Sequence, residues 1–444
     1  MERVSSRAER WWVLAAGVGL LTVAGAVFSW SLYARPLKAF FGWSSFEVAL
    51  AFSVVVVFIG VGAILGGFLH DRFGPRRIGI AGALLWGIGS ILSGLGLAHF
   101  GLLWLYVTYG VIGGTGCGMM YVVPGACVTR WFPEERGLAN GVTLCGFGLG
   151  SLVFNLVAGL IPAFAHAADA ATRIITLRDD ALAAGRTFVL PPHIENVDIG
   201  VVASLFTWSG VAFAVIGCLC AFVLHAPPAG YVVPKAAAML AKERDFTPRE
   251  MLRTPAFYLM WLVILVNGTC GLALFSNAVA IYADLTNTKA VIATLAFGWI
   301  SSANGLGRFL WAWLSDGFGR TRSLFVCFIL EGVAMLGLAH AHDTFTVSIA
   351  FAIILLCFGG VFGVAPAVMA DFYGTRFLGE DYSFIITAAS AAGLIGPLLV
   401  AFLEDALGSL TSWLTPLAIT LLVASILPLL MRQPRGLPEA TASH

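Results

Sequence analysis

Residues 301–314 read Ser-Ser-Ala-Asn-Gly-Leu-Gly-Arg-Phe-Leu-Trp-Ala-Trp-Leu and lie inside an apolar run from about 291 to 314. At about 1.5 Å per residue, a helix of this length crosses the hydrocarbon core of a bilayer. Arg308 is the only arginine or lysine deep in any apolar segment. An arginine near the bilayer centre costs roughly 2.5–3.5 kcal/mol on insertion scales, so it needs a compensating partner. The stretch predicts a membrane-spanning helix that carries one buried cation.

The polar residues of this stretch share one face of the predicted helix. Ser301, Asn304, Arg308 and Ser315 lie at positions i, i+3, i+7 and i+14. This face therefore meets protein or a wet cavity, and the apolar remainder meets lipid. Arg308 is either a structural arginine satisfied by an acid or by helix carbonyls, or an anion-binding cation in a transport cavity. We favour the second interpretation.

Composition extends the membrane prediction to the whole chain. Of 444 residues, 59% are hydrophobic and 11% are charged, whereas soluble domains carry about 25% charged residues. We therefore expect an all-α membrane protein with twelve transmembrane helices. The predicted spans are 11–33, 46–69, 78–98, 101–128, 137–164, 199–224, 255–282, 291–314, 322–341, 345–368, 383–403 and 412–431.

The distribution of basic residues predicts the orientation. With the N-terminus inside, 18 lysines and arginines fall on the cytoplasmic side and six on the other, and Arg308 completes the 25. This excess favours a multi-pass protein of the plasma (inner) membrane with both termini cytoplasmic. The first apolar run lacks a small-residue cleavage site, so we expect an uncleaved first helix.

Several functional classes are not expected from the sequence. A net charge of +1 gives no indication of nucleic-acid binding, and all eight cysteines lie in apolar spans, where they are typical of core packing. Neither a nucleophile–base pair nor a metal cluster is evident within the spans. We therefore expect no enzyme, no cofactor and no metal site.

The chain repeats itself at an offset of about 245 residues. The pattern that runs from Gly67 to Arg76 returns from Ala312 to Arg320, 245 residues later, and Phe28-Ser29 returns as Phe275-Ser276, 247 later. These offsets predict two six-helix halves with a binding site between them. We place the halves at 1–225 and 255–444, a cytoplasmic linker at 226–254, and a long outward loop at 165–198.

The repeated pattern resembles a family signature. Gly67, Asp71, Arg72, Gly74 and Arg76 resemble the helix two–three loop of the major facilitator superfamily, and Asp316 and Arg320 stand at the matching places of the second half. The resemblance implies the twelve-helix major facilitator fold and a gating role for these residues. The glycines permit a tight turn, and Asp71 can accept bonds from a facing helix end and from the arginines.

A narrower resemblance concerns three stretches. Tyr121-Val-Val-Pro124, residues 130–141 (RWFPEERGLANG) and residues 304–308 (NGLGR) resemble the oxalate:formate antiporter branch and its relatives, the monocarboxylate transporters. This resemblance implies that Arg308 binds the substrate carboxylate and that Tyr121 lines the same cavity.

The sequence departs from these relatives at two places. Oxalate-handling members carry a lysine on helix eleven, whereas this helix has none, and the matching position falls at or near Ala389. Animal monocarboxylate transporters carry an aspartate one turn before the arginine, where this chain has Asn304. The first departure argues against a dicarboxylate substrate, and the second argues against the usual proton carrier.

Further candidates for the cavity and for proton coupling lie in other spans. Glu331 is the most deeply placed acid, and it is either a proton carrier or a neutral, hydrogen-bonded structural acid. The other candidate cavity residues are Phe28, Phe147, Asn277, Phe358 and Phe362.

Together these residues predict a secondary transporter of a small monocarboxylate of the lactate, formate or pyruvate type. It would work by alternating access as a monomer in the lipid bilayer, with proton symport favoured over exchange. One alternative is an oxalate:formate-type exchanger that uses Arg308 alone. Another is a non-transporting membrane sensor with the same fold.

Overall fold

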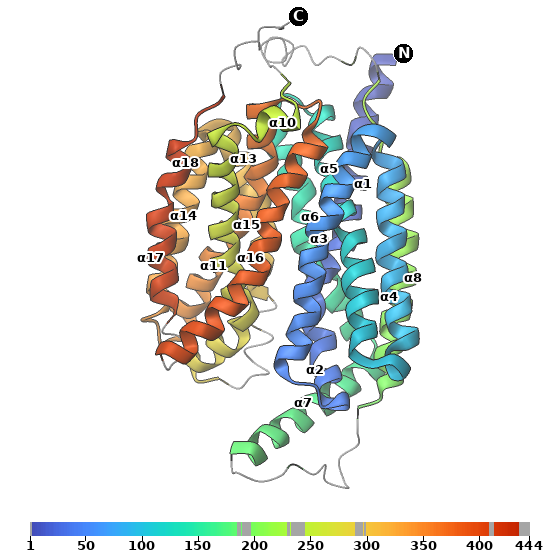
Figure 1. The fold of residues 1–444 in the computed structure, drawn as a ribbon, viewed down its shortest axis with the longest axis vertical. Helices are drawn as coiled ribbons and strands as arrows, with labels where there is room; N and C mark the ends of the chain where they lie inside the picture. The colour runs from blue at the N-terminus through green and yellow to red at the C-terminus, as the bar shows by residue number, and fades with distance from the viewer. Residues whose placement is uncertain are drawn as a thin grey trace, which may run out of the picture.

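The computed structural model describes residues 2–183, 188, 197–228, 231, 245–288, 296, 299–407 and 413–434, and within them it contains helices and no strand (Figure 1). The first part of the chain forms α1 (Glu2–Gly25), η1 (Ala26–Ser29), α2 (Trp30–Phe41), α3 (Ser45–Phe73), α4 (Pro75–Leu105), η2 (Tyr106–Gly113), α5 (Gly114–Trp131), α6 (Arg136–Gly159), α7 (Pro162–Ala183) and α8 (Ile199–Val223). The second part forms α10 (Pro248–Met251), α11 (Pro255–Thr286), α13 (Ser302–Phe318), α14 (Arg320–Leu338), α15 (Thr344–Tyr373), α16 (Leu378–Leu407), α17 (Leu414–Ala424) and α18 (Ile426–Leu430).

Helices of the described residues fall on each of the twelve predicted spans, which confirms the predicted class, an all-α membrane protein. The first span is α1 to α2, and the twelfth is α17 with α18. The third and fourth spans form one helical stretch over 75–131, 57 residues long. The chain changes direction within it at Gly101, whose φ of +65° lies in the region that favours glycine.

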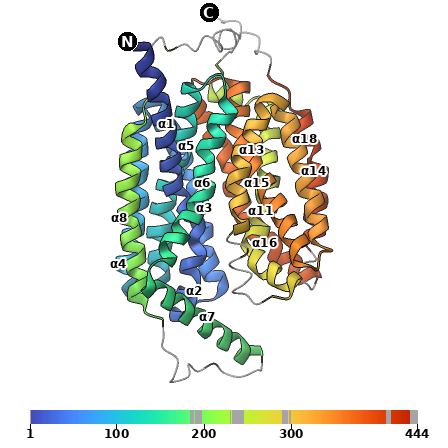
Figure 2. The ribbon, with the colours of Figure 1, turned by 180° about the vertical axis from the view of Figure 1, so that it is seen from behind.

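The spans form two groups that face each other. Figures 1 and 2 show α1–α8 on one side and α11–α18 on the other. Between the groups, α3 packs against α16, and α6 packs against α13 and α15. The N-terminal end of α1 and the C-terminal end of α18 lie at the same end of the bundle (Figure 1), which we call the terminal end.

Glycines bring α6 and α13 into backbone contact. A Cβ atom added to Gly148 would overlap the backbone of Gly305. One added to Gly141 would lie 2.7 Å from the Ala312 Cβ and 2.9 Å from the Arg308 carbonyl oxygen. These four residues and Arg308 form what we call the glycine seam, and small residues are the means by which membrane helices approach this closely.

The first part of the region predicted as an outward loop at 165–198 is helical. The fifth span ends with α6 at Gly159, earlier than the predicted 164, and α7 begins at Pro162. A proline fits the first turn of a helix, and the alanine-rich sequence that follows favours helix formation. Ala167, Ala171 and Ile174 of α7 are buried, and α7 packs against α2.

Candidate functional site

Arg308 lies in the middle of α13 with its side chain enclosed. The residue is 2% exposed. Its Nε donates to the Asn304 Oδ1 at 3.3 Å, and its Nη1 donates to the Tyr121 hydroxyl at 3.2 Å. In the part of the chain that the structure describes, no carboxylate pairs with this guanidinium. The site therefore holds a buried cation whose visible partners are neutral.

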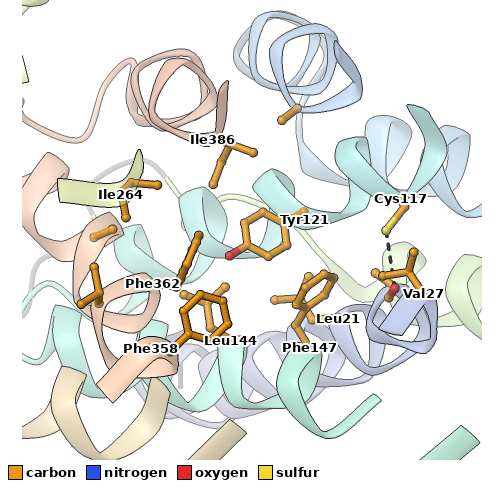
Figure 3. Close-up of a cluster of buried hydrophobic side chains, with 14 of the residues drawn as sticks. Leu21, Val27, Cys117, Tyr121, Leu144, Phe147, Ile264, Phe358, Phe362 and Ile386 are labelled. Carbon is orange, nitrogen blue, oxygen red and sulfur yellow. Dashed lines mark hydrogen bonds between the residues drawn. The ribbon is translucent and has the colours of Figure 1, made fainter. Parts of the chain in front are cut away.

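Aromatic rings surround this cation. The Arg308 Cζ lies 5.3 Å from the centre of the Phe147 ring and 5.4 Å from that of Phe362, and such contacts stabilise a desolvated cation. Figure 3 shows Tyr121 between Phe147 on one side and Phe362 with Phe358 on the other. These residues come from α5, α6 and α15. The sequence candidates Tyr121, Phe147 and Phe362 thus meet around Arg308, and Phe358 packs against Phe362 with ring centres 5.4 Å apart.

A small pocket lies beside Asn304. Its lining residues come from both groups of helices and are Phe28, Gly148, Ser151, Leu272, Phe275, Ser301, Asn304 and Phe358. The Asn304 Nδ2 is buried and has no hydrogen-bond partner, so an amide donor remains for a ligand. The predicted wall residue Phe28 contacts both Phe147 and Phe275, with ring centres 5.2 and 6.0 Å apart.

The two remaining candidates for the cavity are Asn277 and Ala389. The side chain of Asn277 lies outside the described residues. Ala389 is half-buried on α16 and packs against the core. It shares a helix face with Tyr382, seven residues earlier, whose hydroxyl lies 3.5 Å from that of Tyr121. Ala389 therefore lies on the side of α16 that faces Tyr121.

Charged residues join the two groups of helices at the terminal end. The Asp71 Oδ1 accepts from the Arg130 Nη2 at 3.2 Å, and its Oδ2 accepts from the Glu380 backbone N–H at 3.2 Å. The Asp316 carboxylate accepts from the backbone N–H groups of Gly137 and Leu138 at 3.0 and 2.8 Å. Each acid thus caps the start of a helix in the opposite group, where the helix dipole favours negative charge.

Asp371 is a third acid in this connection between the two groups of helices. We call the connection the terminal gate, and its residues are Asp71, Arg130, Arg136, Asp316, Arg320, Asp371 and Glu380. The Asp371 carboxylate accepts from the Arg136 Nη1 at 3.2 Å and from the Arg320 Nε at 2.8 Å. Arg320 also pairs with Asp316 at 2.6 Å. Arg76 lies apart from these contacts, because its guanidinium stacks over Phe222 at 4.6 Å. Arg72 is exposed, and Gly74 is the residue that ends α3. Gly67 lies six residues before the last residue of α3, where an added Cβ would overlap the carbonyl oxygen of Gly379 on α16.

Removal of the Asp316 cap is expected to loosen the terminal gate. In Asp316→Ala, two backbone N–H groups of α6 lose a charged acceptor, which costs about 1–2 kcal/mol. Hydrogen–deuterium exchange at residues 136–141 should therefore accelerate about 5- to 30-fold.

Asp343→Ala is the matched control, because Asp343 caps the start of its own helix, α15, by accepting from the Thr346 N–H at 2.9 Å. Its effect should stay at the start of α15. Equal protection of 136–141 in Asp316→Ala and the wild type would contradict the gate contact.

Glu331 has a neutral partner in the structure. The residue is 0% exposed, and its Oε2 accepts from the Asn267 Nδ2 at 2.7 Å. Asn267 belongs to α11 and Glu331 to α14. This contact is compatible with a hydrogen-bonded structural acid and leaves the Glu331 Oε1 without a partner.

Sequence reasoning overlooked several residues of these sites. Tyr382, Asp371 and Asn267 were not singled out, and nothing in a single sequence says which polar residue faces another helix. Phe275 and Ser301 appeared only as parts of patterns. A signal for Asp371 exists, because an acid directly after a long apolar run and before Arg376 marks a span end.

Comparison with known proteins agrees with the fold. The family profile described as Major Facilitator Superfamily matches residues 14–303 and 270–444. The chain is 28% identical to the oxalate:formate antiporter of Oxalobacter formigenes over 94% of this chain and 89% of that protein. It is 28% identical to the apicoplast pyruvate carrier 1 of Toxoplasma gondii over 75% and 65%, respectively. The crystal structure of the E. coli fucose:proton symporter FucP is similar with a TM-score of 0.65 and 16% identity, covering 95% of this chain and 98% of that one.

Proposed function

Because this chain belongs to the major facilitator superfamily, whose members move small substrates across membranes, we propose that it is a secondary transporter of small monocarboxylates. One observation carries the proposal: Arg308 is a buried cation without a carboxylate partner in the described part of the chain. A carboxylate that binds there forms the missing charge-assisted hydrogen bonds.

The surroundings of Arg308 support a small monoanion. The free Nδ2 of Asn304 and the hydroxyl of Tyr121 supply neutral donors for the remaining oxygens. Phe147, Phe358 and Phe362 offer apolar surface to a short carbon tail. A similar chemistry is named for two relatives, the oxalate:formate antiporter and the pyruvate carrier.

Alternating access assigns a role to the terminal gate. The predominance of basic residues in the loops at the terminal end favours the cytoplasm there, so the gate contacts close the cytoplasmic side. Breaking these contacts would open Arg308 to the cytoplasm while the two halves close on the opposite side of the membrane. In this proposal both termini are cytoplasmic, the membrane is the plasma membrane, and one chain is sufficient for transport.

Counterflow in proteoliposomes tests the substrate class. Vesicles that contain the protein and are loaded with unlabelled formate, lactate, pyruvate or oxalate should accumulate the labelled monocarboxylates. Liposomes without the protein should not. A protein that binds these anions but moves none of them would be a sensor with a transporter fold.

Oxalate exchange is the second candidate, because the Oxalobacter protein matches 94% of this chain. Accumulation of oxalate at the expense of formate in the same counterflow assay would favour this candidate.

The mode of coupling gives a separate prediction. We expect an inwardly directed proton gradient to raise the initial rate of monocarboxylate uptake severalfold, because a proton that accompanies the anion makes the transported charge neutral. The measurement compares imposed pH gradients of opposite sign at zero membrane potential. Uptake that ignores the gradient but requires internal anion would establish exchange instead.

A further inference from the structure

Asp381 is a buried acid without a partner at the terminal end of α16. The residue is 1% exposed, and neither of its carboxylate oxygens accepts a hydrogen bond. It precedes the span predicted at 383–403. A lone ionised carboxylate in such a place is costly, so it either holds a proton or binds another cation.

The groups around Asp381 are mostly acidic. Asp71 on α3, Glu380 on α16 itself and Asp245 ahead of α10 all raise its pKa by their negative charge. Arg130, which binds Asp71, is also engaged with the carbonyl oxygens of Thr375 and Arg376. The other titratable groups that face this region are His70, which pairs with Asp71 at 3.0 Å, Arg72, which interacts with Glu380, and Tyr373, which interacts with Asp381.

Burial is the largest cause of the shift, and together with these acids it raises the pKa of Asp381 to about 8. Among the residues that the structure describes, no group of His, Cys, Asp or Glu side chains is arranged to hold a metal ion. A proton is therefore the cation that this carboxyl takes.

We propose that Asp381 is a proton-binding site of the terminal gate, which holds a proton while the gate is closed and releases it when the gate opens. The inference rests on the proposed function, because it assumes that this end of the bundle opens during transport. Asp71 and Glu380, whose contact ties α3 to α16, are gate residues. Separation of these helices would bring Asp381 to water.

The direction of the pH effect follows from the two states. In the closed state the Asp381 pKa is near 8, whereas a carboxyl in water has a pKa near 4. The proton thus stabilises the closed gate fully below about pH 4, and this stabilisation is lost as the pH rises through about 8. Alkaline solution at the terminal end therefore favours opening.

The proton site is coupled to the substrate site through the next residue. The Tyr382 hydroxyl lies 3.5 Å from that of Tyr121, which in turn accepts from Arg308. A movement of the first turns of α16 therefore changes the contacts of the residue that the anion would meet.

Infrared spectroscopy of the purified full chain tests proton binding. The wild type should show a protonated-carboxyl band that disappears with a midpoint near pH 8, and Asp381→Asn should lack this titration. Glu331→Gln is the matched control, since Glu331 is also a buried acid but pairs with Asn267, and it should keep the titration. If Asp381→Asn still titrates like the wild type, the proposal is wrong.

Counterflow at equal pH on both sides tests the gate. The wild-type rate should rise severalfold from pH 6 to pH 9. Asp381→Asn, which imitates the protonated acid, should stay at the low-pH rate, and Asp381→Glu should keep the slope. A wild-type rate independent of pH would refute only the proton site, whereas absence of counterflow at every pH would refute the transport function itself.

Discussion

Arg308→Ala is expected to abolish carboxylate transport while the protein remains folded in the membrane. Loss of one partner of a buried, hydrogen-bonded charge pair costs about 2–5 kcal/mol, which is roughly a 30- to 5,000-fold loss of affinity. The wild-type cation already has only neutral partners, Asn304 and Tyr121. Its removal therefore takes a partner from no carboxylate in the described residues.

Two measurements accompany this variant. Substrate-induced thermal stabilisation should disappear in Arg308→Ala, and the size-exclusion profile should not change. Arg308→Lys should transport poorly, because an ammonium cannot donate in the two-pronged geometry or stack on Phe147 and Phe362 as a planar guanidinium does. Wild-type uptake by the alanine variant would exclude Arg308 as the anion site.

Monocarboxylates are expected to compete for transport far better than oxalate. A dianion that faces Arg308 alone leaves about one negative charge uncompensated in an enclosed site. Even partial desolvation of that charge costs several kcal/mol, about a thousandfold in affinity. The Oxalobacter relative is an oxalate:formate antiporter, so this expectation separates the two candidate functions. A wild type that prefers oxalate would require a second cation.

A lysine at Ala389 should reverse this preference. Ala389 shares the face of α16 that carries Tyr382 and Ile386. In Figure 3 the side chain of Ile386 points toward Tyr121 and Phe362. In Ala389→Lys, oxalate should compete at least tenfold better and lactate worse, because a monoanion leaves the added cation unpaired. Ala388→Lys is not a suitable control, since that position is fully buried. Ala389→Gln has a similar length without charge, and it should leave the preference unchanged.

The sequence predicted the membrane fold, and it singled out the residues at the centre of the candidate site, for clear physical reasons. Twelve apolar spans and the offset of about 245 residues required two helical halves. An arginine within a membrane span, such as Arg308, has to face protein or water and not lipid. The structure brings Tyr121, Phe147 and Phe362 to that arginine.

Other parts could not be predicted because they depend on which helices meet. Asp371 lies 235 residues from Arg136 and 51 from Arg320, yet it contacts both. Asn267 of α11 and Glu331 of α14 are 64 residues apart in the chain, and the fold alone brings them into hydrogen-bond contact. The helix α7 could not be predicted over its full length for another reason. Its mixture of alanine and charge is too polar for a span, and only its contact with α2 shows which face is buried.

The glycine seam is a contact at which the two halves can rotate against each other. Interlocking side chains would resist rotation, because ridges must leave their grooves before helices can turn. Gly148 and Gly305 present backbone to backbone, so small rotations of α6 on α13 meet little steric resistance. Arg308 belongs to this seam, since its carbonyl oxygen faces Gly141. In the proposed transport cycle, a cation at this pivot would move least when the halves tilt, so a bound anion would stay in place while access to it passes from one side of the membrane to the other.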